Sequence, residues 1–145
     1  MSGGPGDGGT GLLAREAASL VARLRLFTPA RWSAALTPYG TRADVVHHLA
    51  QALADAEGAA PVRLPRLDSD LALPDQLAVT ADDLVRAGGD VPGDVRQRDL
   101  VAHLLLHRSE LLDEAVPPGL ARDLGEPGAD ALLARAREVC ARSRR

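Results

Sequence analysis

The sequence predicts an all-α fold: a four-helix bundle followed by a short fifth helix at the C-terminus. Alanine and leucine dominate the apolar residues, there is one Trp, one Tyr and one Phe, and β-branched residues other than Val are few. This composition favours helices over a sheet. Apolar residues also recur at helical spacing in five stretches that Gly- and Pro-containing segments separate. A chain of 145 residues is long enough to bury one hydrophobic core.

The N-terminal end of the chain combines a polar tail with the first helix. Residues 1–10 carry Gly and Pro without an apolar partner, which predicts a disordered tail. We expect residues 11–145 to form a single domain. The first helix is expected over residues 11–26, and its apolar face would consist of Leu13, Ala17, Leu20, Val21 and Leu24.

A short segment with turn residues connects the first helix to the second. Thr28 and Pro29 should end the first helix, and Pro29 can open a short helical turn that carries Trp32, the largest apolar side chain. Residues 36–40 read as a loop. Thr41 then has the side chain and the position of an N-cap for the next helix.

The second helix is predicted over residues 42–57 and ends at Gly58. His48 lies beside its apolar face, whereas His47 falls on a side lined by alanines. Residues 58–71 contain two prolines and an Arg-rich segment, and this connection is long enough to cross the bundle from end to end. The apolar face of the second helix would consist of Val45, Leu49, Ala52 and Leu53.

Three further helices complete the prediction. The third is expected over residues 73–87, with an apolar face of Leu77, Val79, Ala81, Leu84 and Val85. The fourth is expected over residues 98–114, with Asp99 in its first turn and Leu100, Leu104, Leu111 and Leu112 on its apolar side, and Pro117 and Pro118 would stop it. An amphipathic fifth helix is expected over residues 129–141.

Histidines mark the candidate functional site. His103 and His107 lie four residues apart on the fourth helix, so both imidazoles point the same way and could close on one divalent ion. All four histidines of the chain lie on two helices, and His48 occupies a place on the second helix that corresponds to that of His103 on the fourth. Three histidines with an open fourth position are typical of catalytic zinc sites, which lower the pKa of a bound water or thiol.

The same residues have simpler interpretations. A histidine beside an apolar face is often a half-buried core residue with a hydrogen-bonded neighbour. Glu110 could orient an imidazole or act as a base, and the favoured alternative is an exposed partner of Arg108 or Arg98. His47 is predicted to be a surface or interhelical residue rather than a ligand.

Net charge, hydropathy and cysteine content limit the possible partners and the cellular compartment. A net charge of −3 and the lack of a basic recognition helix argue against nucleic acid as a partner. No apolar stretch approaches the roughly 18–20 residues that a membrane span needs, so we expect no membrane partner. Cys140 is the only cysteine, which excludes an intramolecular disulfide and predicts a cytoplasmic protein. The exclusive use of Arg as the basic residue, with no Lys, indicates a GC-rich genome of the actinobacterial type.

Four segments of the chain resemble a known family, the DinB-like helical bundles, and within it the N-terminal domain of mycothiol-dependent maleylpyruvate isomerases. The similar segments are TPARW at residues 28–32, RADVVHHLA at 42–50, LPDQLAVTADDL at 73–84 and HLLLH at 103–107. Together they fall within residues 12–115. Two positions differ from the family pattern: YGT at 39–41 replaces a usual Gly-Trp, and Glu110 stands where the isomerases usually carry Asp.

The resemblance implies a four-helix bundle with a long crossover between its second and third helices. It also implies a divalent metal held by one histidine of the second helix and two ligands of the fourth, which here are His48, His103 and His107. The cofactors would be this ion, with Zn²⁺ first and Ni or Fe also suited, and a low-molecular-weight thiol such as mycothiol.

Together these features predict a metal-binding transferase or isomerase in which the thiol, as its thiolate, attacks an electrophilic carbon of a small-molecule substrate. Glu110 is the candidate catalytic residue. The candidate substrate contacts are Arg31, Trp32, Tyr39 and Arg42, for which packing and solvation are the alternative. The alternative function is a non-catalytic binding or dimerisation module of the same fold, and a homodimer is possible in either case.

Overall fold

The computed structural model describes residues 11–37, 39–57, 63–88, 95–116, 119, 122 and 126–143. This part of the chain is mostly helical, with a sheet of two very short strands, which confirms the all-α class. The predicted disordered tail, residues 1–10, lies outside the described residues. None of the described helices combines the length and the apolar character that crossing a membrane requires.

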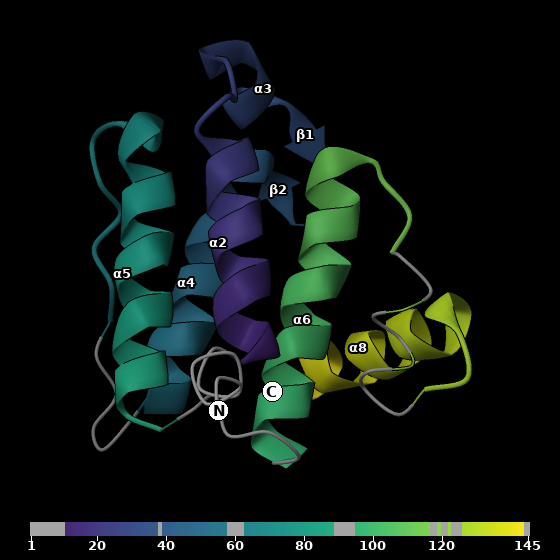
Figure 1. Ribbon diagram of the computed structural model, residues 1–145. Helices are drawn as coiled ribbons and strands as arrows, with labels where there is room; N and C mark the ends of the chain where they lie inside the picture. The colour runs from purple at the N-terminus through teal and green to yellow at the C-terminus, as the bar shows by residue number, and fades with distance from the viewer. Residues whose placement is uncertain are drawn as a thin grey trace.

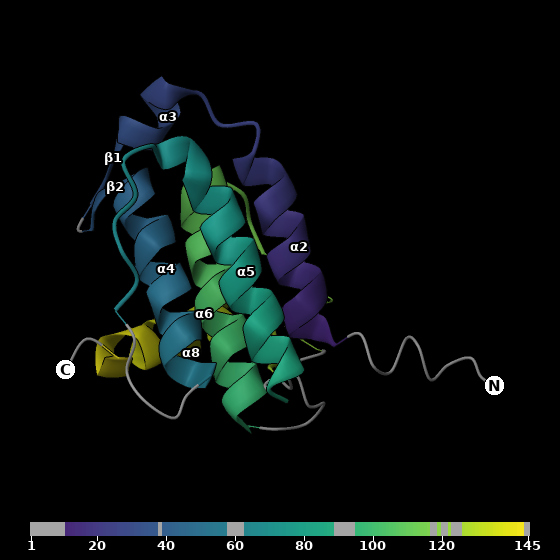
Figure 2. The ribbon, with the colours of Figure 1, turned by 90° about the vertical axis from the view of Figure 1, so that its left-hand side faces the viewer.

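Four long helices run alongside one another, and the last helix lies across them (Figures 1 and 2). Shorter elements join α2 to α4 at one end of the bundle and precede α5. In chain order the elements are α2 (Leu12–Leu24), α3 (Pro29–Ser33), β1 (Ala35–Leu36), β2 (Gly40–Thr41), α4 (Arg42–Glu57), η1 (Asp70–Ala72), α5 (Leu73–Arg86), α6 (Val95–Leu112) and α8 (Ala129–Ser143).

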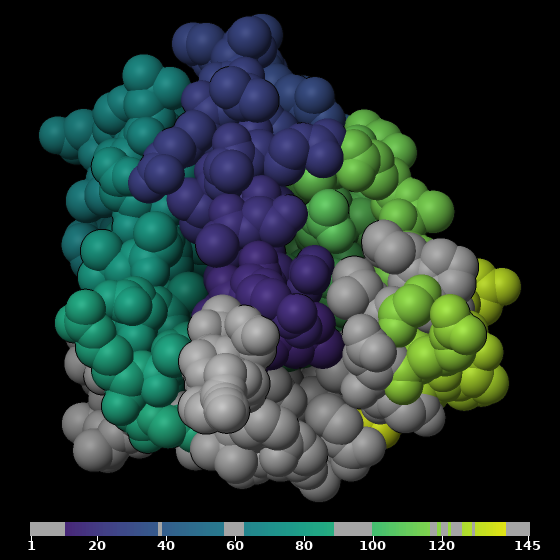
Figure 3. All heavy atoms as spheres, in the orientation of Figure 1, coloured from purple at the N-terminus to yellow at the C-terminus, as the bar shows by residue number. Residues whose placement is uncertain are grey.

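Helix α6 is the central helix of the molecule. Its residues 101–107 are all buried, so this stretch is covered on every side and not on one apolar face alone. Helices α2 and α4 pack on it, and α8 covers a further side, with Leu132 and Ala136 buried. The face in Figure 3 shows α2 between α5 and α6. The C-terminal helix therefore completes the core around α6.

Several helix boundaries differ from the prediction, and those of α2 and α6 have visible physical causes. Helix α2 ends at Leu24 and not at residue 26, because the amides of Leu26 and Phe27 bond the carbonyls three residues back and tighten the chain before Pro29. As a result Leu26 is 80% exposed. Helix α6 begins at Val95, three residues early, because residues 95–97 contain no helix breaker, so Asp99 is not in the first turn. It ends at Leu112, since Asp113 adopts a left-handed backbone conformation (φ 56°).

The predicted loop over residues 36–40 contains a small hairpin. Ala35 pairs with Thr41 and Leu36 with Gly40 in antiparallel register. Thr41 is the predicted N-cap of α4: its hydroxyl accepts the amide of Asp44 at 3.2 Å, and the Asp44 carboxylate accepts the amide of Thr41 at 2.9 Å. This reciprocal pair fixes the start of the helix that carries His48.

Most of the predicted apolar positions are buried, and four are not. Val79 is 59% exposed, and three others are half-buried, namely Ala52, Val85 and Leu100. On α5 the buried position next to Val79 is Thr80, whose hydroxyl donates to backbone carbonyls of its own helix and so needs no water. The described part of the predicted crossover, residues 63–71, runs back along α4 before α5 begins, whereas residues 58–62 lie outside the described residues.

Candidate metal centre

Three histidines from two helices meet between α4 and α6. His48 comes from α4, and His103 and His107 come from α6. One ring nitrogen of each lies within 4.8 Å of one ring nitrogen of each of the others. The ring centroids of the two α6 histidines are 4.7 Å apart, and that of His48 lies 5.6 and 5.9 Å from them. The three histidines predicted from the sequence therefore form one cluster that could hold a metal ion.

The local structure explains why they meet. A spacing of four residues places His103 and His107 one turn apart on the same side of α6. That side faces α4, where His48 lies two turns beyond the capped start of the helix. His103 and His107 are 3% and 0% exposed, while His48 is half-buried. Solvent therefore reaches the cluster least at the two α6 histidines.

His107 shows the arrangement that a metal ligand needs. Its Nδ1 lies 3.1 Å from Oε1 of Glu110, a carboxylate one turn further along α6. A carboxylate accepts a hydrogen bond, so in the neutral form of His107 this contact favours the tautomer with the proton on Nδ1 and the lone pair on Nε2. Nε2 is buried, and no group in the described part of the chain hydrogen-bonds to it. A metal ion is a partner that would satisfy this nitrogen.

Tyr39 is the predicted substrate contact that the structure places beside the cluster. Its ring packs edge-on against the His107 ring, with centroids 5.3 Å apart and planes at 86°. The turn between β1 and β2 holds it there through a 2.8 Å hydrogen bond from its amide to the carbonyl of Leu36. The hairpin therefore brings a half-buried aromatic residue to the histidine cluster.

The other three predicted substrate contacts are engaged within the protein. Trp32 is 1% exposed and packs in the core against Phe27, with ring centroids 5.0 Å apart. Arg31 and Arg42 both donate to the backbone carbonyl of Leu111. These contacts favour packing and helix capping as the role of these three residues.

His47 does not belong to the cluster. Nε2 of His47 lies 3.2 Å from the carbonyl oxygen of Leu64, so this histidine links α4 to the crossover segment. The side chain of Cys140 lies outside the described residues.

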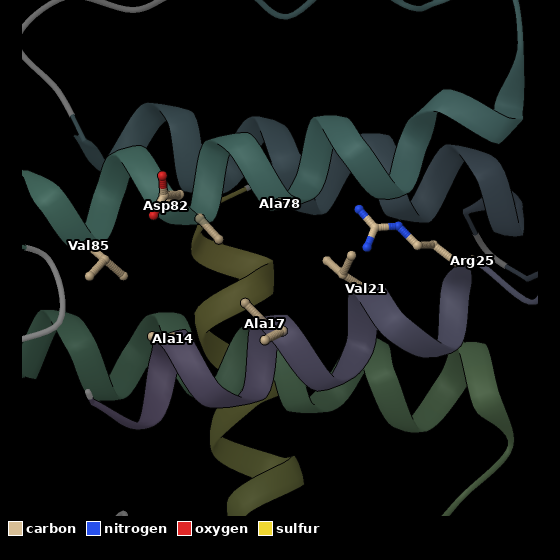
Figure 4. A pocket seen from close by; sticks show the side chains of 9 residues that line it. Ala14, Ala17, Val21, Arg25, Ala78, Asp82 and Val85 are labelled. Carbon is tan, nitrogen blue, oxygen red and sulfur yellow. The ribbon is translucent and has the colours of Figure 1, made fainter. Parts of the chain in front are cut away.

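A groove lies apart from the histidines, between α2 and α5. It has a volume of about 300 Å³, and Figure 4 shows Ala14, Ala17 and Val21 of α2 facing Ala78, Asp82 and Val85 of α5 across it. Short alanine side chains leave this space where leucines would fill the seam. No histidine lines it, so it is separate from the candidate metal centre.

No protein-family model, curated protein or solved structure matches the chain. The assignment of a function therefore depends on the histidine cluster and its surroundings.

Proposed function

We propose that the protein is a metal-binding, DinB-like helical bundle that uses a low-molecular-weight thiol of the mycothiol type to transform a small electrophilic substrate, as a transferase or isomerase. The single observation that carries the metal site is His107: it is fully buried, its Nδ1 contacts Glu110, and its Nε2 has no hydrogen-bond partner among the described residues. Four long helices and a long connection between α4 and α5 support the DinB-like bundle.

The ligand set supports a catalytic rather than a structural ion. Structural zinc sites are usually closed by four protein ligands, whereas three histidines leave one position open. When bound, a divalent ion in such a site supplies Lewis acidity that lowers the pKa of a thiol or water. Three imidazoles suit Zn²⁺, and also Ni or Fe.

The surrounding residues have distinct roles in this proposal. Glu110 orients the His107 ring and favours the tautomer that leaves Nε2 free to bind the ion. Tyr39 forms the wall of the site on the hairpin side, where a substrate would lie. In the reaction the thiol gives its proton to water and its sulfur forms a bond to the electrophilic carbon. The displaced electron pair moves to the leaving group or to a conjugated carbonyl of the substrate, which takes up a proton from water. In an isomerisation the carbon–sulfur bond then breaks again and releases the thiol.

A screen of thiols against electrophiles tests the proposed activity. Mycothiol, glutathione and cysteine are each offered with a set of activated carbonyl and alkenoate compounds to the Zn²⁺-loaded protein. The expected result is thiol-dependent turnover that His48→Ala abolishes and Tyr39→Phe retains in part, because the phenylalanine keeps the ring against His107. Metal-loaded protein that turns over no pair faster than His48→Ala would contradict the catalytic role.

A second candidate function is a non-catalytic binding or dimerisation module of the same fold. The groove between α2 and α5 favours it, because a volume of about 300 Å³ lined mainly by apolar side chains could receive a partner away from the histidines. Metal content separates the two candidates, since this module needs no ion.

A further inference from the structure

Two arginines from different elements converge on the C-terminal end of α6. Nη2 of Arg31 and Nε of Arg42 lie 3.3 and 3.4 Å from the carbonyl oxygen of Leu111, the next-to-last residue of that helix. The last four carbonyls of a helix have no partner within the helix and carry the negative end of its dipole. Positive side chains therefore cap α6 from outside.

Arg42 is the more deeply engaged of the two. Its side chain is 13% exposed, and two further contacts use the rest of its guanidinium group. Nη1 donates to the carbonyl of Ala35 at 3.1 Å, and Nη2 lies 3.4 Å from a carboxylate oxygen of Asp113. One planar group thus contacts β1, the last turn of α6 and the residue that ends α6.

Arg42 and Leu111 both lie close in sequence to histidines of the cluster. Arg42 is the first residue of α4, the helix that carries His48 six residues later. Leu111 lies four residues after His107 on α6. With a rise of about 1.5 Å per residue, His48 lies about 9 Å from Arg42 along α4, and His107 lies about 6 Å from Leu111 along α6. The contact therefore links the two helices close to the ligands they contribute.

We propose that Arg42 is a positioning residue that sets the axial register of α4 against α6, and so brings His48 level with His103 and His107. This inference rests on the proposed metal site. Metal–nitrogen distances tolerate deviations of about 0.2 Å, whereas a slide of one helix by a single residue moves a side chain by about 1.5 Å. A contact that resists such a slide controls whether three histidines, or only the two on α6, bind the ion.

The shape of the arginine side chain matters to this role. Its fork reaches two carbonyls and a carboxylate at once, from Nε, Nη1 and Nη2. A lysine at this position keeps the positive charge near the end of α6 but presents a single point donor. The variant Arg42→Lys therefore keeps the positive charge and removes the simultaneous contacts of the guanidinium group.

The test is Zn²⁺ affinity, measured by competition with a chromophoric chelator, together with the visible absorption spectrum of the Co²⁺-loaded protein. We expect Arg42→Lys to weaken Zn²⁺ binding about tenfold or more, as changes next to metal ligands do, and to alter the Co²⁺ spectrum. Arg23→Gln is the matched control, because Arg23 comes from α2 and forms an exposed ion pair with Glu114, just beyond the same helix end.

A double-mutant cycle completes the test. If Arg42 acts by placing His48, Arg42→Lys should leave the Zn²⁺ affinity of His48→Ala unchanged, because that variant already lacks the third ligand. If Arg42→Lys binds Zn²⁺ with wild-type affinity and shows the wild-type Co²⁺ spectrum, the inference is overturned, even if the melting temperature of the variant is lower. The proposed metal site would not be affected by that result. Failure of the wild type itself to bind Zn²⁺ would instead refute the proposed metal site.

Discussion

Replacing His107 by leucine should have opposite effects on the metal-free and metal-loaded protein. His107 is 0% exposed, and its Nε2 has no hydrogen-bond partner in the described part of the chain. Leaving a buried polar group unsatisfied costs about 1–3 kcal/mol, which leucine would recover. The variant also loses the contact with Glu110, worth about 0.5–3 kcal/mol. Because the Glu110 side chain is 27% exposed, its carboxylate can be hydrated instead.

These terms nearly cancel, so the free energy of unfolding in chelator should change by no more than about 2 kcal/mol in either direction. With Zn²⁺ at about a thousand times its Kd, the wild type should gain about 4 kcal/mol. For 145 residues the unfolding entropy is about 0.3 kcal/mol/K, so this gain raises the Tm by about 13 °C. His107→Leu should show almost none of this rise.

The assay is thermal and urea unfolding of both proteins, each with Zn²⁺ and with chelator. His47→Leu is the matched control, because His47 contacts the carbonyl of Leu64 and lies outside the cluster. It should keep the full response to Zn²⁺. A wild type indifferent to Zn²⁺, together with a loss of more than about 3 kcal/mol in metal-free His107→Leu, would show that His107 is a structural core residue and refute the reasoning.

Three further predictions concern residues that hold His107 or the start of α4 in place. Glu110→Gln should weaken Zn²⁺ binding about 10–100-fold in chelator competition, because an uncharged amide holds His107 less firmly. Gly40→Ala should lower the free energy of unfolding by at least about 1–2 kcal/mol in urea titrations, since Gly40 has φ +114° and an added Cβ would meet the Asp44 carboxylate at 2.5 Å. The amide of Thr41 donates to the Asp44 carboxylate and holds its pKa below the ordinary value of 3.8. The ionised carboxylate therefore stabilises the fold at pH values above 3.8, and this stabilisation is lost as the pH falls through the lowered pKa of the folded state. Asp44→Asn should therefore reduce the fall in stability between about pH 5 and 2, with Asp75→Asn, an exposed carboxylate on α5, as the control.

The helices and the pair of histidines on α6 could be predicted because each depends on local spacing. His103 and His107 share one side of α6 whatever surrounds that helix, and the apolar positions of α2 are all buried as their periodicity predicts. The meeting with His48 required that α4 and α6 be neighbours. The likeness of the two histidine-bearing segments suggested this arrangement but did not require it.

Features that depend on tertiary contacts were not visible in the sequence. The fully buried stretch of α6 looked like a one-sided helix, because nothing in its own sequence shows that α8 covers its other side. The capping of Leu111 by Arg31 and Arg42 joins residues 80 and 69 positions apart, so no local pattern could reveal it. Similarly, Val79 fits a helical apolar face, yet Thr80 takes the buried position by bonding to its own backbone.

Metal content tests the central claim most directly. Untagged wild-type protein, His103→Ala/His107→Ala and His47→Ala are incubated with Zn²⁺, freed of loosely bound ions by gel filtration and analysed for metal per chain. The account predicts about one ion in the wild type and in His47→Ala, and a loss of that ion in the double variant. A wild type without bound metal, or a double variant that retains it, would contradict the site formed by His48, His103 and His107.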